Sequence, residues 1–168
     1  MNDLLQALKL TQTEIKESLI DIGARDTNLA RHFKQQGLKS ITLLDKEDLI
    51  DGNNDDFKFI KQDITEPEFL LTDVYDLVVC RHTLPFTKEP LVNLSKILIA
   101  GKIIFVTFFG ENDDRKKLSL LSQETIDSHL EKFTDYTVIY KNNLEYDGFL
   151  YNGDKIHWNV LGYLIKRK

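Results

Sequence analysis

The chain has 168 residues, 42% of them hydrophobic and 29% charged, and a formal net charge of −5 at pH 7. This length and composition fit one globular domain with a core of its own, and they exclude a disordered or low-complexity protein. The acidic balance disfavours a nucleic-acid partner, the single cysteine excludes an internal disulfide, and the apolar runs are too short to span a membrane.

Apolar runs of strand length alternate with helix-period segments through the first three quarters of the chain. This alternation is typical of an α/β protein with a parallel sheet. We expect strands at 18–22, 39–44, 57–61, 75–80 and 102–109, and helices within 1–17 and at about 27–33, 90–98 and 122–133. The first helix is expected to reach Ile15, Asp26 or Thr27 to cap the second, and Ser122 to cap the last. The polar run 51–56 predicts an exposed loop.

Two long β-rich runs, 136–144 and 157–166, end the chain. The stretch between them contains Gly148 and Gly153 and has no room for a crossover helix. Parallel neighbours need a connection of about a dozen residues, usually helical, so this pair is expected to be antiparallel. The predicted sheet therefore has five parallel strands followed by an antiparallel pair.

Ligands of open α/β sheets bind beyond the C-terminal ends of the strands, so the residues that follow each strand are the candidates for a site. Gly23 follows the first strand, and Asp45 ends the second strand 22 residues later. An acid at that distance is where the hydroxyls of a ribose are bound. A plain turn with a solvated acid would give the same pair of residues.

Three features favour a nucleoside cofactor without a pyrophosphate. The first turn reads Asp21-x-Gly23-x-Arg25-x-Thr27 rather than G-x-G-x-x-G, it opens with an acid inside the strand, and the sheet ends in an antiparallel hairpin. The chain resembles the small class I S-adenosylmethionine-dependent methyltransferases, most closely the bacterial branch with tellurite-resistance-type proteins. The stretches that carry this resemblance are LIDIGARDTNLARHF, ITLLDKEDL, FIKQDI, YDLVVCRHTLPF, GKIIFVTFFGENDD and KIHWNVLGYLIKRK.

The resemblance implies a Rossmann-like three-layer α/β sandwich, with a seven-stranded, mostly parallel sheet whose last strand is antiparallel. It implies a single domain, 1–168, with an N-terminal helix at 1–17, a cofactor-binding half at 18–110, and a substrate-side half at 111–168 that ends in the hairpin. The cofactor would be S-adenosylmethionine. Its methionine part would meet Asp21, Gly23 and Ala24, its ribose Asp45, and its adenine Lys46, Asp63 and Ile64, while Arg81 and His82 would lie under the sulfonium.

Arg25 and Thr27 stand where the family has glycines. A degenerate member of the fold that only binds or interacts is therefore the alternative to an enzyme. For the enzyme we expect in-line methyl transfer to a small molecule, with a macromolecular acceptor as a third reading. Positioning the acceptor is most of the catalytic work, because the sulfonium is already a good leaving group.

His82 is the candidate base, since its intrinsic pKa is near 6.5, although capping the next helix or meeting solvent would explain it equally. Cys80 is expected to be a buried structural thiol. We expect no metal: Glu111, Asp113 and Asp114 fit a solvated loop better than a site for a cationic acceptor or a metal ion.

For the remaining side chains of interest we expect structural rather than functional roles. Trp158 is expected to pack against the sheet rather than to stack on a substrate, and His32 and His129 are expected at the surface. The N-terminus has no signal-peptide cleavage site, so we expect a cytoplasmic protein. Little of the chain is left to build a lid, so the acceptor site is expected to be open or completed in a homodimer.

Overall fold

The structure is a computed structural model that describes residues 1–52, 56–150 and 152–168. Its elements, in chain order, are α1 (Asn2–Leu10), β1 (Ser18–Ile22), α2 (Asn28–Gln35), β2 (Ser40–Asp45), β3 (Lys58–Lys61), β4 (Tyr75–Cys80), the 3-10 turn η1 (Leu84–Phe86), α3 (Pro90–Leu98), β5 (Gly101–Phe109), α4 (Gln123–Leu130), β6 (Tyr136–Phe149) and β7 (Lys155–Arg167). Residues 53–55 of the expected exposed loop lie outside the described residues.

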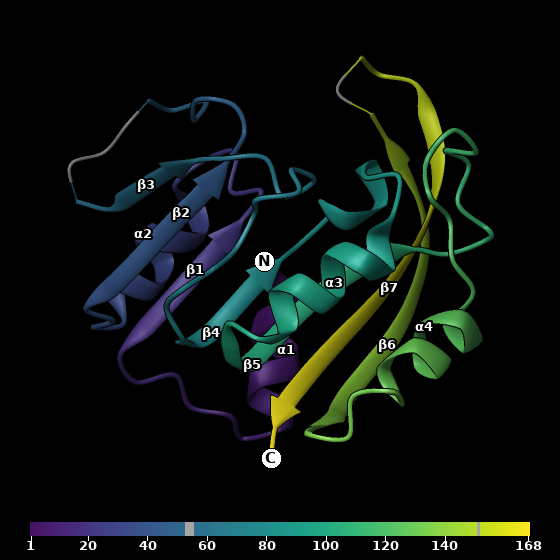
Figure 1. Ribbon diagram of the computed structural model, residues 1–168. Coiled ribbons are helices and arrows are strands. Elements are labelled where there is room, and N and C mark those ends of the chain that lie inside the picture. Colours follow the sequence, from purple (N-terminus) through teal and green to yellow (C-terminus); the bar gives the residue numbers. More distant parts are fainter. Residues whose placement is uncertain (53–55, 151) are drawn as a thin grey trace.

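The described strands form one seven-stranded sheet in the order β3-β2-β1-β4-β5-β7-β6 (Figure 1). The first five are parallel, and β7 runs antiparallel to both β5 and β6. The expected α/β fold, with a mostly parallel sheet and an antiparallel last strand, is confirmed.

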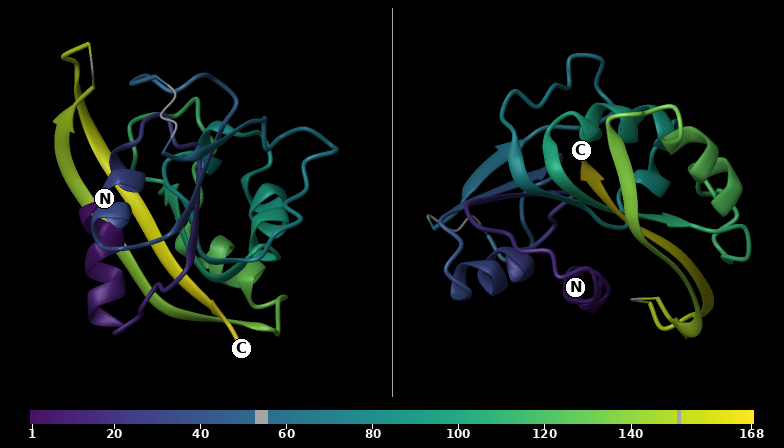
Figure 2. Two further views of the ribbon diagram at one scale, coloured as in Figure 1. Left: turned by 90° about the vertical axis from the view of Figure 1, so that its left-hand side faces the viewer. Right: turned by 90° about the horizontal axis from the view of Figure 1, so that it is seen from below.

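Helices cover both faces of the sheet, which gives the three expected layers (Figure 2). One apolar cluster joins α1 and α2 to one face, and the other joins α3 and α4 to the opposite face. Successive strand residues point to opposite faces. Leu19 and Leu77 therefore enter the first cluster, while Ile20 and Val78 enter the second.

The first helix is shorter than expected, and of the two candidate caps of α2 it is Asp26 whose side chain binds the start of the helix. The first helix ends at Leu10 rather than reaching Ile15, because Gln12 takes a left-handed conformation with φ 51° that breaks the helix. Thr27 precedes α2 but makes no side-chain cap, and the Asp26 carboxylate accepts the Asn28 amide at 2.9 Å instead.

The predicted cap of α4 is confirmed, since Ser122 accepts the Thr125 amide at 3.1 Å. The C-terminal hairpin is antiparallel as expected but longer, because β6 continues to Phe149 and β7 begins at Lys155. Since β5 pairs with β7 only as far as Val160, the hairpin tip extends beyond the end of β5.

The strand order reverses between β1 and β4, which are neighbours in the sheet. The chain leaves β1 toward α2 on one face and leaves β4 toward α3 on the other. The two loops therefore diverge and leave an opening at the C-terminal edge, where ligands of open α/β sheets bind.

Candidate functional site

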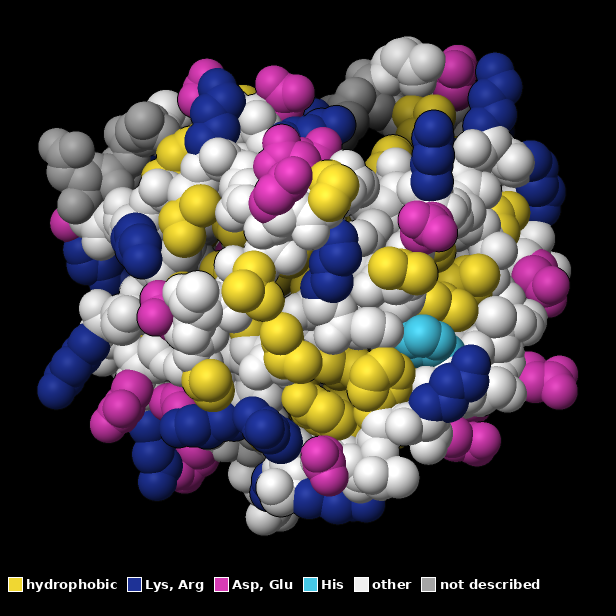
Figure 3. Space-filling view, in the orientation of Figure 1, with side chains coloured by type: hydrophobic (Ala, Val, Ile, Leu, Met, Phe, Trp, Pro, Cys, Tyr) yellow, Lys and Arg dark blue, Asp and Glu magenta, His cyan; other side chains and the backbone are white. Residues whose placement is uncertain are grey.

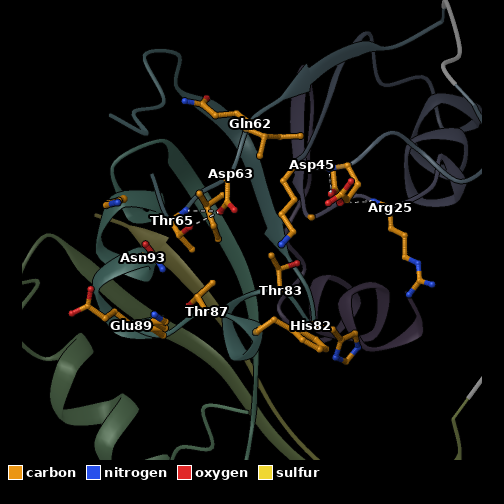
Figure 4. A pocket seen from close by; sticks show the side chains of 18 of the residues that line it. Arg25, Asp45, Gln62, Asp63, Thr65, His82, Thr83, Thr87, Glu89 and Asn93 are labelled. Atoms are coloured by element: carbon orange, nitrogen blue, oxygen red, sulfur yellow. Dashed lines mark hydrogen bonds between the residues drawn. The ribbon is translucent and has the colours of Figure 1, made fainter. Parts of the chain in front are cut away.

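A cavity of about 880 Å³ lies at this opening (Figure 4). Every parallel strand except β5 contributes the residues that follow it, and η1 and the first turns of α3 close the other side. The lining residues include Gly23, Arg25, Asp45, Lys46, Asp63, Ile64, His82, Thr83, Phe86 and Asn93.

Gly23 makes the turn out of β1 possible. Its φ is +73°, a conformation that side-chain-bearing residues rarely adopt, and its amide donates to the Leu44 carbonyl at 2.7 Å. A Cβ added here would lie 2.0 Å from Thr83 Oγ1. Thr83 is held in place because its hydroxyl donates to the carbonyls of Ile22 and Arg81. The loops after β1 and β4 therefore meet at a point where only glycine fits.

Gly23→Ala is expected to destabilise the protein by about 2–4 kcal/mol, because it combines an unfavourable φ with a clash. Gly37→Ala is the matched control: Gly37 has φ +92°, yet nothing lies within 4 Å of the added Cβ, so it should cost only about 1 kcal/mol. Urea unfolding measures both. Equal losses would show that the contact with Thr83 does not matter.

Asp45 is fixed by the backbone of two loops. Its carboxylate accepts the Arg25 amide at 3.1 Å and the Glu47 amide at 3.0 Å. A carboxylate offers about four lone-pair sites, so these two bonds orient it and leave capacity for two hydroxyls of a ligand. Its place in the cavity, at the end of β2, fits the ribose position expected from the sequence.

The residues after β3 form the next part of the cavity wall. The Asp63 carboxylate accepts the amide and the hydroxyl of Thr65, at 2.9 and 2.8 Å, and these bonds hold its pKa below the usual range. Ile64 is buried and gives this wall an apolar surface. Lys46 lines the same cavity and also lowers the pKa of Asp63.

The two residues that replace glycines leave the cavity open. Arg25 has φ 53°, the left-handed conformation that a glycine would take freely, and its exposed side chain points away from Asp45 and the other lining side chains (Figure 4). Thr27 is fully buried and is not among the lining residues. Its hydroxyl and its amide both donate to Asp51.

Three predicted site residues lie outside the cavity lining. Ala24 is buried in the apolar cluster beneath α2, and Arg81 pairs with Asp3 of α1 at 3.4 Å. Asp21 is buried within β1, where loss of water raises its pKa to about 8, with further contributions from the negative charges of Asp26 and Asp45. Asp21 is therefore mostly protonated at neutral pH.

The buried Asp21 makes stability depend on pH. Because the pKa of Asp21 is raised on folding, its contribution to the free energy of unfolding is fully favourable below about pH 4 and is lost as the pH rises through 8. Between pH 6.5 and 7.5 we expect the free energy of unfolding to fall by about 1 kcal/mol. Asp21→Asn should flatten this slope in urea unfolding measured at each pH, and the same slope in both proteins would refute the assignment.

His82 packs against aromatic side chains of β5 and β7. Its ring stacks on Phe109 at 5.7 Å and meets Trp158 edge-on at 6.5 Å, while its amide donates to Thr107 Oγ1 at 2.8 Å. Burial, and then the charge of Arg81, lower its pKa to about 4, so the ring is neutral at pH 7. His82 thus neither caps η1 by its side chain nor stands free in solvent.

The loop after β5 differs from the expected solvated loop at one residue. Asp113 is fully buried, and its carboxylate binds the Arg115 guanidinium through two bonds of 2.7 Å. The Arg115 guanidinium lies between the rings of Phe109 and Trp158, at 3.5 and 3.9 Å. Glu111 and Asp114 are exposed as expected. Sequence spacing could not reveal this cluster, because its rings come from β5 and β7.

The other expectations for single residues hold in part. Cys80 is buried, and burial raises the pKa of its thiol, as suits a structural cysteine. Trp158 packs on the sheet, where its ring stacks on Tyr146. His32 and His129 are half-buried rather than fully exposed, and His129 is 3.0 Å from Ser95 Oγ.

Several cavity residues had no signal in the sequence. Phe86 and Asn93 come from η1 and α3, whose apolar spacing predicts a helix but not the side that faces the opening. Within the parts of the chain that the structure describes, no three acidic, histidine or cysteine side chains are grouped so that they could hold a metal ion. None of the described helices has the length and apolar character needed to cross a membrane.

Comparison with known proteins identifies the fold. No protein-family model matches the chain, and no curated protein does so either. Among solved structures, TehB from Haemophilus influenzae superposes with a TM-score of 0.75 at 14% identity over 100% of this chain. This chain spans 62% of that TehB chain.

Two further structures cover most of both chains. A SAM-dependent methyltransferase from Anabaena variabilis matches with a TM-score of 0.67 and 12% identity, over 98% of this chain and 84% of the other. An S-adenosylmethionine-dependent methyltransferase from Clostridium acetobutylicum matches with a TM-score of 0.66 and 10% identity, over 99% and 89%. At such identities the similarity establishes a shared fold and no more.

Proposed function

We propose that this protein binds S-adenosylmethionine and transfers its methyl group to a small-molecule acceptor. The observation that carries the proposal is the cavity at the switch in strand order, where Asp45 ends β2 and Asp63 follows the neighbouring β3, beside the apolar wall of Ile64. This set of side chains suits a nucleoside: a carboxylate with free acceptor capacity for ribose hydroxyls, and an apolar surface with a second acid for an adenine.

The cofactor would be held by residues of the half 18–110. Gly23, Asp45, Lys46, Asp63 and Ile64 line the cavity and are the proposed binding residues. The cofactor would supply an activated methyl group on a sulfonium.

The other predicted site residues have proposed roles other than holding the cofactor. Asp21, Ala24 and Arg81 would act from behind the cavity wall: Asp21 as a buried carboxyl that is mostly protonated at neutral pH, Ala24 through packing and Arg81 through its pair with Asp3. Neutral His82 is the proposed base that accepts the proton of the acceptor. Residues 111–168 would contribute to the acceptor side.

A small-molecule acceptor is favoured over a nucleic acid by charge. The net charge is −5, and on the face shown in Figure 3 basic and acidic side chains are interspersed rather than gathered into a basic patch. A cytoplasmic protein that acts alone or as a homodimer is the setting that we propose for this reaction.

Calorimetric titration with S-adenosylhomocysteine and S-adenosylmethionine tests the proposal. We expect saturable binding with a rise in melting temperature, because a ligand that binds only the folded state stabilises it by mass action. Absence of heat and of a thermal shift at about millimolar cofactor would overturn the proposal. It would favour instead the degenerate binding protein that Arg25 and Thr27 suggested.

A further inference from the structure

A second pocket, of about 320 Å³, adjoins the first at His82. It opens beside the N-terminal end of α1 and under the β6–β7 hairpin. Its lining residues are Met1, Asn2, Asp3, His82, Leu144, Tyr146 and Val160. Of the residues described, His82 alone lines both pockets, and its side chain points away from Asp45 and Asp63 (Figure 4).

The wall of the second pocket on the sheet side is apolar. Val160 of β7 is paired with Phe109 on one side and Leu144 on the other, so the three side chains form a row across the sheet. Leu144 and Tyr146 remain 40% and 48% exposed, although both are large and apolar in character. Exposed apolar side chains around a hollow mark a ligand site more often than isolated ones do.

The aromatic part of this wall is held rigidly. The Tyr146 ring stacks on Trp158, with 8° between the planes and 6.1 Å between the centroids. Trp158 in turn is fixed on the Arg115 guanidinium, which the buried Asp113 carboxylate holds. A planar ligand could therefore extend an existing stack without first ordering it, which favours binding.

The polar part of the second pocket consists of Asn2, Asp3 and His82. The Nδ1 atom of His82 is buried and has no hydrogen-bond partner among the groups that the structure describes. A buried polar atom without a partner is unfavourable, and a rotation of the ring that brings this nitrogen to the pocket would let a ligand hydroxyl or thiol donate to it. The Arg81 guanidinium and the Asp3 carboxylate beside it face each other at 3.4 Å.

We propose that this second pocket binds the methyl acceptor, and that the acceptor is a small molecule with an apolar face for the sheet-side wall and a reactive atom that carries a proton, such as a phenol, an alcohol or a thiol. The inference rests on the proposed function. Methyl transfer to such an acceptor forms a bond from its oxygen or sulfur to the methyl carbon while the sulfonium carbon–sulfur bond breaks and leaves its electron pair on sulfur. The acceptor's proton passes to His82 and then to water.

The experiment uses the full chain saturated with S-adenosylhomocysteine and follows the indole N–H signal in NMR. The chain has one tryptophan, Trp158, so the single indole signal reports on the aromatic wall. We expect p-cresol to shift this signal with a dissociation constant of about millimolar. The near-isostere 4-fluorotoluene lacks the hydroxyl donor and should bind at least about fivefold more weakly, because it leaves His82 without a partner.

Two variants on the same strand locate the site. Leu144→Gln should weaken p-cresol binding about fivefold, whereas Phe149→Gln, which also changes an exposed apolar residue of β6, should leave it unchanged. If S-adenosylhomocysteine does not bind, the proposed function fails and the acceptor pocket with it. If it binds but p-cresol does not, or if the two variants behave alike, only the acceptor pocket is overturned. Equal affinity for both probes would overturn the requirement for a proton on the acceptor atom.

Discussion

Replacing Asp45 by alanine is expected to weaken the binding of S-adenosylhomocysteine by more than about tenfold, because it removes the partner of two ribose hydroxyls. The structure explains why the loss of affinity should be this large. The amides of Arg25 and Glu47 hold the carboxylate at the end of β2, within the cavity wall, so a ligand pays little entropy to meet it. Isothermal calorimetry measures the change.

The Asp45 test needs a control for stability, because the substitution also removes the acceptor of two backbone amides. Asp45→Asn keeps the shape and one carbonyl acceptor, so it should retain the turn and lose only part of the affinity. Asp73→Ala removes an exposed carboxylate away from the cavity and should leave affinity unchanged. If Asp45→Ala binds S-adenosylhomocysteine as tightly as the parent chain, the ribose assignment is wrong.

Replacing Asp113 by alanine is expected to lower the free energy of unfolding by about 3–5 kcal/mol, the usual effect of leaving a buried charge without its partner. The Arg115 side chain is only 15% exposed and lies between two aromatic rings, so water cannot replace the lost carboxylate fully. The backbone amide of Asn159, which donates to the Asp113 carboxylate at 3.0 Å, also loses its acceptor. Urea unfolding gives the value.

Two further variants distinguish the effect of leaving a buried charge unpaired from the effect of removing any carboxylate. Asp114→Ala removes the exposed neighbour, whose carboxylate accepts the His157 backbone amide, and should cost less than about 1 kcal/mol. The double substitution Asp113→Ala with Arg115→Met removes both charges and should cost less than Asp113→Ala alone. Similar losses for Asp113→Ala and Asp114→Ala would contradict the buried ion pair.

The sequence alone was sufficient for the sheet and for placing Gly23 and Asp45 at the strand ends that line the cavity. Apolar runs of strand length identify the parallel strands, because strands covered on both faces carry little polar surface. The short connection within the last pair leaves only an antiparallel arrangement. Gly23 and Asp45 could be located because the backbone itself places them: one at the turn out of a strand, the other at the end of its neighbour.

Only the tertiary structure decided which way side chains point and what surrounds them. Ala24 and Arg81 stand next to cavity residues in the sequence, yet they face the apolar cluster and Asp3. Asp113 looks like a loop acid in the sequence but is fully buried and paired with Arg115, whose guanidinium lies between rings of β5 and β7. Burial and charge pairing depend on contacts between residues far apart in the chain, and local composition does not encode them. For the same reason His82, which sequence could mark only as a candidate base, acquires its neutral ring and its place between two pockets from the fold.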